Sequence, residues 1–465
     1  MRRSRVVLFG FCLFVASLAA KAEDVTTVGV HEPYSLESPH PYGVAFGSAA
    51  RTWTIQYPGA TYVRVHFSAF DLGPGDRLEI SAPDGSDSHV YTLLGPHRSG
   101  EFWAFTVIGD TAVLKLESVS GHGYGFQIDG VGKGVMPLVP EPLETKTVCG
   151  PKDWKDVACY EASNPTEVAN SRGSVLALSG CCIVCSAFKV SDSGQFMTNN
   201  HCIATETGVQ TTELRFDYQR PGCEAGRADS TGSVLGGSML QTDLDLDYTL
   251  FTTIGDSSSI PCLELEDRLG SLNERIYIPS HPSGGPKTLS LTSTHPQDPS
   301  GFCEIDEAPL VANDNDVGYY CDTADGSSGS PVLSGLTNKV IALHHYGGCL
   351  NSGVRMDRII PAITGLLDTC AAGSGWCGNG DCSASEDQCT CAADCGIPPL
   401  LEIPNVTCSD SLDNDCDLLT DCADPDCVGD TACPTCKPVG AACSARTDCC
   451  TGRCKGQGAN RTCRP

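Results

Sequence analysis

Three polar side chains of this 465-residue chain have the types that nucleophilic acyl transfer requires. Ser328 lies in the run G-S-S-G-S-P, His201 ends the run F-M-T-N-N-H, and Asp247 opens the run D-Y-T-L-F. A serine hydroxyl attacks a carbonyl at neutral pH only if a neutral histidine takes its proton, a carboxylate orients that histidine and amide donors stabilise the oxyanion. We therefore interpret Ser328 as the nucleophile, His201 as the base and Asp247 as the orienting carboxylate.

The glycines around Ser328 favour a backbone role in the same chemistry. Gly326 and Gly329 allow the chain to turn so that successive N–H groups point at one spot. The N–H groups of Gly326 and Ser328 are the predicted oxyanion hole. An ordinary Gly/Ser turn before the strand P-V-L remains the alternative interpretation of this run.

The base and the carboxylate have alternatives too. His201 could be a surface histidine beside a bridged cysteine. Asp243 and Asp245 share the acidic run with Asp247, but only Asp247 is followed at once by a strand pattern. A carboxylate that opens an apolar strand needs hydrogen bonds to be tolerated there.

The segment that must position these side chains runs from 148 to 372. It contains 12 cysteines, many β-branched runs and many glycine turns, with one convincing helix near 358–367. This profile predicts an all-β barrel domain.

A domain without cysteines precedes it, over residues 23–135. Short runs with period-two alternation and Gly, Pro or Asp turns predict an antiparallel β-sandwich. The order W-x-I, V-H-F-S-A-F-D-L, D-x-L-E-I, G-Y-G-F resembles a CUB domain without its cysteines. The domain is either a removable pro-region or a retained binding module, and the Pro-rich residues 136–147 are an extended linker.

The chain begins with the pattern of a secretory signal, predicted over 1–22. Of 29 cysteines, Cys12 lies in this signal, which leaves 28, an even number that predicts disulfides in a secreted protein. The net charge of −27 argues against nucleic acid and anionic membranes as partners.

Cysteines crowd and large apolar residues become rare after residue 372. We predict three small modules, over 373–398, 399–434 and 435–465, and the last resembles a cystine-knot miniprotein. They would attach the protein to a surface or matrix. The second module is either a solvated acidic segment or a structural calcium site, with these candidate ligands: Asp413, Asp415, Asp417 and Asp421.

The order His-Cys, Asp-x-x-Leu, Gly-x-Ser-Gly-x-Pro resembles the chymotrypsin-fold serine proteases, and among them the bacterial lysyl endopeptidase branch. The resemblance covers nearly all of 148–372. It implies a double β-barrel and three disulfide bridges, and we add a fourth pairing of our own. The four predicted bridges are Cys149–Cys349, Cys159–Cys223, Cys185–Cys202 and Cys303–Cys321.

The resemblance also indicates where a specificity pocket should lie. Asp322, six residues before Ser328, matches the position of the carboxylate that binds lysine and arginine in trypsin-like enzymes, although it could be a turn residue. Thr323 and His344 match positions that glutamyl endopeptidases use, but the lysyl branch has them too. The lysyl aspartate has no counterpart here in Leu350-Asn351. A weak preference for cleavage after basic residues is the prediction.

The sequence therefore predicts an all-β protein, with a double β-barrel chymotrypsin-like protease domain between an antiparallel β-sandwich and small disulfide-rich modules. Its predicted function is that of a secreted serine endopeptidase, active on protein or peptide substrates and needing no cofactor for catalysis. An inactive protease-like binding or adhesion protein is the alternative.

Overall fold

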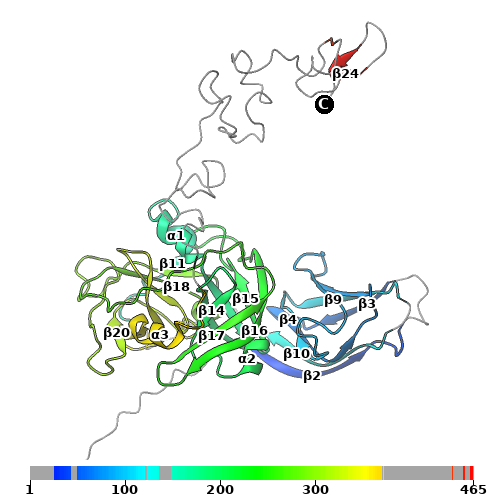
Figure 1. Cartoon of the computed structure of the whole chain (residues 1–465), viewed down its shortest axis with the longest axis horizontal. Coiled ribbons are helices and arrows are strands. Elements are labelled where there is room, and N and C mark those ends of the chain that lie inside the picture. Colours follow the sequence, from blue (N-terminus) through cyan, green and yellow to red (C-terminus); the bar gives the residue numbers. More distant parts are fainter. Residues whose placement is uncertain are drawn as a thin grey trace, which may run out of the picture.

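A computed structural model describes most of the first 370 residues and little of the tail (Figure 1). The described residues are 26–42, 50–120, 123–135, 148–368, 370, 442–443, 454–455 and 461–463. The predicted signal, the linker, the modules over 373–398 and 399–434 and the four candidate calcium ligands lie outside them. Of the third module only a few residues are described, including the paired strands β24 (Cys454–Lys455) and β25 (Thr462–Cys463).

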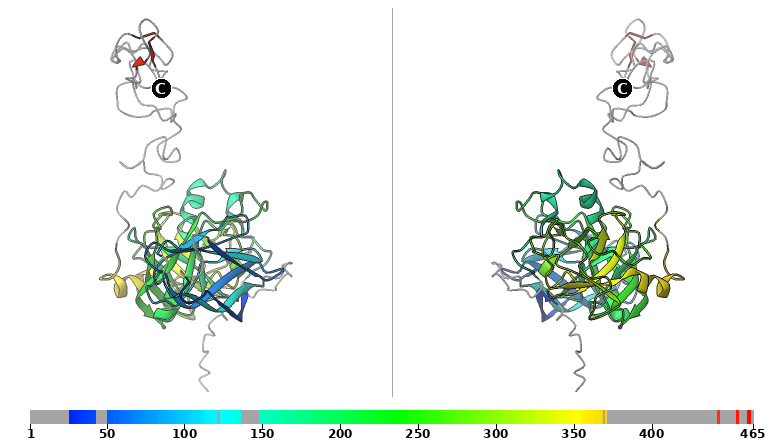
Figure 2. Two further views of the ribbon diagram at one scale, coloured as in Figure 1. Left: turned by 90° about the vertical axis from the view of Figure 1, so that its right-hand side faces the viewer. Right: turned by 90° about the vertical axis from the view of Figure 1, so that its left-hand side faces the viewer.

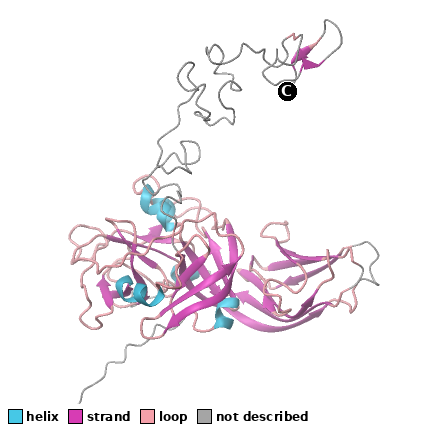
Figure 3. Ribbon diagram, in the orientation of Figure 1, coloured by secondary structure: helices cyan, strands magenta, loops and turns pink. Residues whose placement is uncertain are grey.

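The N-terminal part is a sandwich of two antiparallel sheets, as the alternating pattern predicts (Figure 3). Aromatic and aliphatic side chains of both sheets fill the space between them, including Phe67, Phe70 and Phe126. One sheet contains β2 (Gly29–Glu37), β10 (Gly125–Gly134), β4 (Tyr62–Asp71), β7 (Phe102–Trp103) and β8 (Val107–Ile108). The other contains β3 (Arg51–Gln56), β9 (Thr111–Glu117), β5 (Arg77–Ser81) and β6 (His89–Tyr91).

The next part is a closed six-stranded barrel. It closes because β13 pairs with both β12 and β14, and β1 (Thr26–Thr27) adds a seventh strand at the edge of β13. The barrel strands are β12 (Ser174–Ser179), β13 (Ile183–Lys189), β14 (Gln195–Thr198), β15 (Thr212–Phe216), β16 (Gly232–Asp243) and β17 (Tyr248–Ile254). Helix α2 (Glu206–Gln210) packs on β16.

The last part is a seven-stranded antiparallel sheet. Helix α3 (Met356–Ile363) follows it, close to the predicted helix, and α1 (Pro165–Ser171) lies before the first barrel. The strand order is β11 (Lys155–Asp156), β19 (Thr288–Ser290), β18 (Ile276–Ser280), β21 (Pro331–Ser334), β22 (Val340–Tyr346), β23 (Asn351–Arg355) and β20 (Asp316–Tyr319). Two short 3₁₀ turns complete the elements, Val157–Cys159 and Pro282–Gly284.

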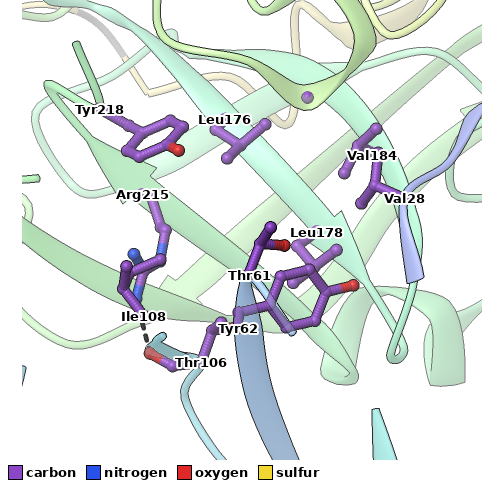
Figure 4. Close-up of a pocket in the computed structure, with 11 residues that line it drawn as sticks. Val28, Thr61, Tyr62, Thr106, Ile108, Leu176, Leu178, Val184, Arg215 and Tyr218 are labelled. Atoms are coloured by element: carbon purple, nitrogen blue, oxygen red, sulfur yellow. Dashed lines mark hydrogen bonds between the residues drawn. The ribbon is translucent and has the colours of Figure 1, made fainter. Parts of the chain in front are cut away.

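The sandwich is docked on the first barrel. Figure 1 shows the two side by side, and in the first view of Figure 2 the sandwich lies in front of the barrel. The Val28 amide donates to the Cys182 carbonyl, and the Tyr62 hydroxyl donates to the Cys181 carbonyl. An apolar cavity of ≈ 70 Å³ remains in this seam, and Figure 4 shows side chains of both parts around it.

Arg64 of β4 crosses the seam. Its side chain is fully buried, donates to the carbonyls of Leu178 and Gly180 in the barrel, and lies 3.9 Å from the Glu213 carboxylate. Burial of a charge is tolerated only when it is paired and hydrogen-bonded. Arg64 therefore ties the sandwich to the barrel.

A second ion pair completes this seam. Glu213 accepts from Arg215 at 2.7 Å and from the amide and hydroxyl of Thr106 at 2.8 and 2.6 Å. Arg215 in turn donates to the Thr106 carbonyl at 2.6 Å and lies 3.4 Å from Asp87 (Figure 4). Two cations thus face two carboxylates across the interface, so the buried charges balance.

Five disulfides are present among the described residues. Three predicted bridges form: Cys149–Cys349, Cys159–Cys223 and Cys185–Cys202. Two further bridges were not predicted, Cys181–Cys182 and Cys262–Cys370.

The predicted Cys303–Cys321 bridge is absent from the structure, and this expectation needs correction. Both residues are fully buried thiols in one apolar cluster, and their side chains are hydrogen-bonded to each other. Burial raises the pKa of both thiols, which keeps them protonated. The sequence correctly placed the two cysteines together but not their covalent state.

Among the described residues, no helix has the length and apolar character that a membrane crossing requires.

Candidate active site

His201 and Asp247 come together because their strands are paired. β14 and β17 are antiparallel, with Thr198 opposite Thr249, so the end of β14 lies beside the start of β17. His201 is in the turn that follows β14, and Asp247 immediately precedes β17. The Asn199 amide holds this junction by donating to the Asp247 carbonyl at 2.8 Å.

The Asp247 carboxylate holds His201 at two points. Oδ1 accepts the His201 backbone N–H at 2.9 Å, and Oδ2 lies 2.7 Å from Nδ1 of the His201 ring. The Asp247 side chain is 4% exposed. Burial raises the pKa of this carboxyl, but hydrogen bonds from His201 and His345 outweigh that effect and lower its pKa to about 2. Asp247 is therefore ionised across the neutral range and fixes the tautomer of His201, with the proton on Nδ1.

Ser328 lies just before β21 of the seven-stranded sheet, and its loop is attached to the barrel that carries His201. Its carbonyl accepts the Ser186 amide of β13 at 2.8 Å and lies 3.9 Å from Sγ of Cys202, the residue after His201. The Ser186 hydroxyl also donates to the Gly326 carbonyl at 3.1 Å. The loop that carries Ser328 is therefore held between the two halves, next to the His201 turn.

Two glycines shape this loop. Gly326 and Gly329 both have φ of +89°, where residues with a side chain are strained. A Cβ on Gly329 would lie 2.0 Å from the Ser186 carbonyl oxygen, so the loop can approach β13 this closely only with glycine there. The amides of Ser327 and Gly329 are bonded within the fold, to the carbonyls of Ala324 and His344.

His201 belongs to a cluster of three residues with metal-ligand atoms, but the chemistry of this cluster does not suit a metal. Cys185, His201 and Cys202 place their ligand atoms within 4.8 Å of one another. Both sulfurs are in the Cys185–Cys202 disulfide, so neither is a thiolate.

The structure corrects the interpretation of Asp322 as a pocket carboxylate. Its side chain is buried, and both oxygens are engaged, Oδ1 by the Cys149 amide and Oδ2 by the Asp153 amide, each at 2.7 Å. The sequence position matched, but tertiary packing directs this carboxylate to the start of the domain, where it holds the backbone beside Cys149–Cys349.

Thr323 and His344 are both fully buried. His344 lies on β22 beside the loop of Ser328, since its backbone exchanges hydrogen bonds with Gly329 and Ser330, each at 2.9 Å. Its Nδ1 is 2.8 Å from the Tyr319 hydroxyl. Burial and the neighbouring His345 lower the pKa of His344 to about 3, so this imidazole is neutral.

The sequence reasoning missed His345 and Asp316. Nδ1 of His345 lies 3.3 Å from Oδ2 of Asp247, and Nε2 of His345 lies 2.9 Å from Oδ2 of Asp316. The signal available in the sequence was a second histidine directly after His344 in an otherwise apolar strand run.

Comparison with known proteins identifies the family of this chain. The family described as "Trypsin-like peptidase domain" matches residues 185–343. "Secreted RxLR effector protein 73" of Plasmopara viticola is 31% identical over 327 residues, covering 65% of this chain and 78% of that protein. The chain belongs to one family with this relative and carries a trypsin-like peptidase domain.

Solved proteases also resemble the trypsin-like peptidase domain. A serine endoprotease from Yersinia pestis is 13% identical to this chain and superposes on it with a TM-score of 0.34. The superposed region covers 44% of this chain and 66% of the endoprotease. This chain therefore spans just under two thirds of that protease. A Glu endopeptidase is 17% identical to this chain, with a TM-score of 0.34. The superposed region covers 47% of this chain and 97% of the Glu endopeptidase.

Proposed function

We propose that this protein is a secreted serine endopeptidase in which Ser328 attacks the peptide carbonyl, His201 is the general base and Asp247 orients His201. One observation carries the proposal: the Asp247 carboxylate holds both the backbone and the ring of His201, at 2.9 and 2.7 Å, beside the loop of Ser328. This arrangement leaves Nε2 of His201 as the atom that accepts a proton.

In the first step Nε2 of His201 takes the Ser328 proton as Oγ bonds to the carbonyl carbon. The same proton then passes to the leaving amine, and the acyl group stays on Ser328. Water, deprotonated by His201, releases the acyl group in the second half of the reaction. Asp247 remains ionised throughout and stabilises the imidazolium that forms.

The amides of Gly326 and Ser328 are the proposed oxyanion donors. Within the described residues the Gly326 N–H donates to no backbone carbonyl, while the adjacent Ser327 N–H donates to the Ala324 carbonyl in the turn. The positive φ of Gly326 supports a turn in which these amides converge. Removal of one such donor costs roughly 10²–10³-fold in kcat in a related chemistry.

Substrate preference is left to experiment. Cleavage after basic residues was expected from Asp322, and its two oxygens are occupied by backbone amides. We therefore propose protein or peptide substrates without a preference based on Asp322. Digestion of a peptide library by the purified enzyme, with the residue before each cut identified, measures the preference.

A fluorophosphonate probe tests the proposed chemistry. We expect covalent labelling of the disulfide-bonded full-length protein at Ser328 and none in Ser328→Ala, with Ser271→Ala, at an exposed serine, as the folded control. Absence of labelling in a correctly folded sample contradicts the proposal.

The alternative function is that of an inactive binding protein. It is favoured by one observation, that the curated relative bears the name of a secreted effector. Under this alternative Ser328→Ala retains the full biological effect of the protein. Loss of that effect together with loss of labelling supports the peptidase instead.

A further inference from the structure

His345 lies in the protein interior between two carboxylates. Its Nδ1 is 3.3 Å from Oδ2 of Asp247, and its Nε2 is 2.9 Å from Oδ2 of Asp316. All three side chains are nearly inaccessible, with exposed fractions of 2% for His345, 4% for Asp247 and 3% for Asp316. Two carboxyl groups and one imidazole are thus enclosed together.

The proton count of this arrangement decides the charge of His345. An ionised carboxylate only accepts hydrogen bonds, whereas a neutral imidazole has one N–H and one bare nitrogen. A neutral ring would therefore direct a lone pair at one of the two carboxylates in a desolvated site. With both nitrogens protonated, His345 donates to Asp247 and to Asp316, and the buried charges are paired.

An irregularity in the sheet directs His345 to this position. The pairing of β22 with β23 is regular up to His344 opposite Gly353 and resumes at Tyr346 opposite Ser352, so His345 is the extra residue of a β-bulge. Bulges change the direction of a side chain and are frequent beside active sites. Because of the bulge, the adjacent histidine rings form hydrogen bonds with different residues, His344 with Tyr319 and His345 with Asp247.

We propose that His345, held as an imidazolium by Asp316, is a positioning residue that donates to Oδ2 of Asp247, the oxygen that also binds the His201 ring, and sets the acid limit of catalysis. The proposal deepens the peptidase function given above and rests on it. His345 touches neither the nucleophile nor the substrate in this scheme. It acts through Asp247.

Other groups around His345 are consistent with a positive charge there. Burial disfavours the charged ring, but the two carboxylates outweigh it and raise the pKa of His345 above its usual value. The neighbouring His344 is neutral. The tilted ring of Tyr346 packs against His345 with 3.9 Å between ring centres, and the Ser352 hydroxyl donates to Asp316 at 3.3 Å. His201 is the remaining titratable neighbour, and its Nδ1 lies on the same oxygen of Asp247, Oδ2, as Nδ1 of His345.

The charge has a consequence for catalysis. His201 takes up a proton more readily when Asp247 is its uncompensated neighbour, and a protonated His201 cannot act as the base. An imidazolium at His345 shares the negative charge of Asp247 and opposes that protonation. The enzyme therefore stays active at a lower pH than it would with a neutral residue at position 345.

The protonation state is measured first, in a way that does not depend on activity. The full-length Ser328→Ala protein, labelled with ¹⁵N in its histidine rings, is observed by NMR at pH 7.5, and His345 is assigned by the signal missing in His345→Gln. We expect both ring nitrogens of His345 to carry protons, and the Nε2 proton to be lost in Asp316→Asn. A bare nitrogen at pH 7.5 overturns the proposal, and an unchanged signal in Asp316→Asn overturns the role of Asp316.

The acid limit is measured in the active enzyme. In His345→Gln we expect the acid limb of the kcat/KM profile to move to higher pH by about one unit, the size of a charge interaction across two side chains at an effective dielectric constant near 20. kcat should fall more than KM changes. The matched control is His66→Gln, which removes another histidine paired with a carboxylate, Asp129 at 2.6 Å, in the sandwich.

The outcomes separate the two proposals. An unmoved acid limb in a folded, active His345→Gln protein contradicts the role of His345, even if its stability is lower. If the wild-type protein fails to react with the fluorophosphonate while the NMR shows a doubly protonated His345, the peptidase function fails and the buried ion cluster stands as structural.

Discussion

Asp247 combines backbone strain with a demanding charge environment. Its φ of +44° lies in the left-handed region, which costs a residue with a side chain of the order of 1–3 kcal/mol. Hydrogen bonds at both carboxylate oxygens and at its carbonyl hold it there. Strain retained at a residue that orients the base is consistent with a catalytic requirement.

Asp247→Asn should therefore inactivate the enzyme without unfolding it. The amide keeps the shape but stabilises the wrong tautomer of His201, and in the serine protease template this change costs about 10⁴-fold in kcat. The measurement is kcat on a peptide substrate. Asp245→Asn is the control, because Asp245 is exposed in the same acidic run and should leave kcat unchanged. Equal losses in the two variants would contradict the assignment.

At the scale of elements, strand β13 contacts both the turn that carries His201 and the loop that carries Ser328. Ser186 on this strand binds the nucleophile loop through its amide and its hydroxyl, and Cys185 ties the strand to the His201 turn. The strand also pairs with β12, β14 and β1. Because one strand contacts both the base turn and the nucleophile loop, the distance between the two depends on its packing.

The contact between β13 and the loop predicts a large effect of Gly329→Ala. A Cβ would lie 2.0 Å from the Ser186 carbonyl, so the loop must move away from β13 and the Ser328 hydroxyl with it. We expect fluorophosphonate labelling to fall at least tenfold.

The control for this prediction is Gly301→Ala. Gly301 also has a positive φ, +79°, but its Cβ would meet nothing within 4 Å. It carries the backbone penalty of about 1–2 kcal/mol without the clash. Comparable labelling in both variants would show that the β13 contact does not position Ser328.

At the scale of the whole molecule, the sandwich and the barrel share buried charges. Arg64, Glu213 and Arg215 are each no more than 3% exposed in the assembled chain. Separation of the two parts would expose or unpair them. This argues for the sandwich as a retained part of the mature enzyme, the second of the two roles expected from the sequence.

Arg64→Met tests the seam. Removal of one partner from a buried charge cluster costs about 3–5 kcal/mol, because the remaining carboxylate stays buried. The free energy of unfolding in urea measures the loss. Arg77→Met is the control, since the Arg77–Glu117 pair is exposed and such pairs contribute about 1 kcal/mol or less. A loss no larger than that of the control would mean that the seam is not a stabilising interface.

The stability of the whole chain should fall in mild acid. Burial lowers the pKa of His281 and of His344 to about 3 in the fold, while both are near 6.5 in the unfolded chain. Between these values the unfolded chain binds more protons, so stability decreases as the pH falls from 6.5 towards 3, by about 1.4 kcal/mol per pH unit for each histidine. His345 acts in the opposite sense, because its stabilisation is complete below 6.5 and is lost as the pH rises through its raised pKa.

Thermal unfolding of the full-length protein between pH 4 and 8 measures this dependence. His281→Gln should reduce the acid slope, since it removes one of the two buried neutral imidazoles. A wild-type melting temperature that is constant from pH 6.5 to 4 would contradict the prediction.

The sequence by itself determined the candidate residues and the strand content, while three of the bridges were implied by its resemblance to the chymotrypsin-fold proteases. His201, Asp247 and Ser328 were identifiable because their chemistry demands those residue types in flanking patterns that a strand or a tight turn imposes. The sandwich followed from period-two alternation, which reports directly on the two faces of a strand. These are local properties, and the sequence records local properties.

Only the tertiary structure decided the partners of the buried polar groups. Asp322 was placed by its spacing from Ser328, but packing directs both its oxygens to the amides of Cys149 and Asp153. His345 was overlooked because its partners lie 98 residues before it and 29 residues before it in the chain. A buried charge is satisfied by whatever the fold brings within hydrogen-bond distance, and that depends on strand order and on a bulge of one residue, which no local pattern specifies.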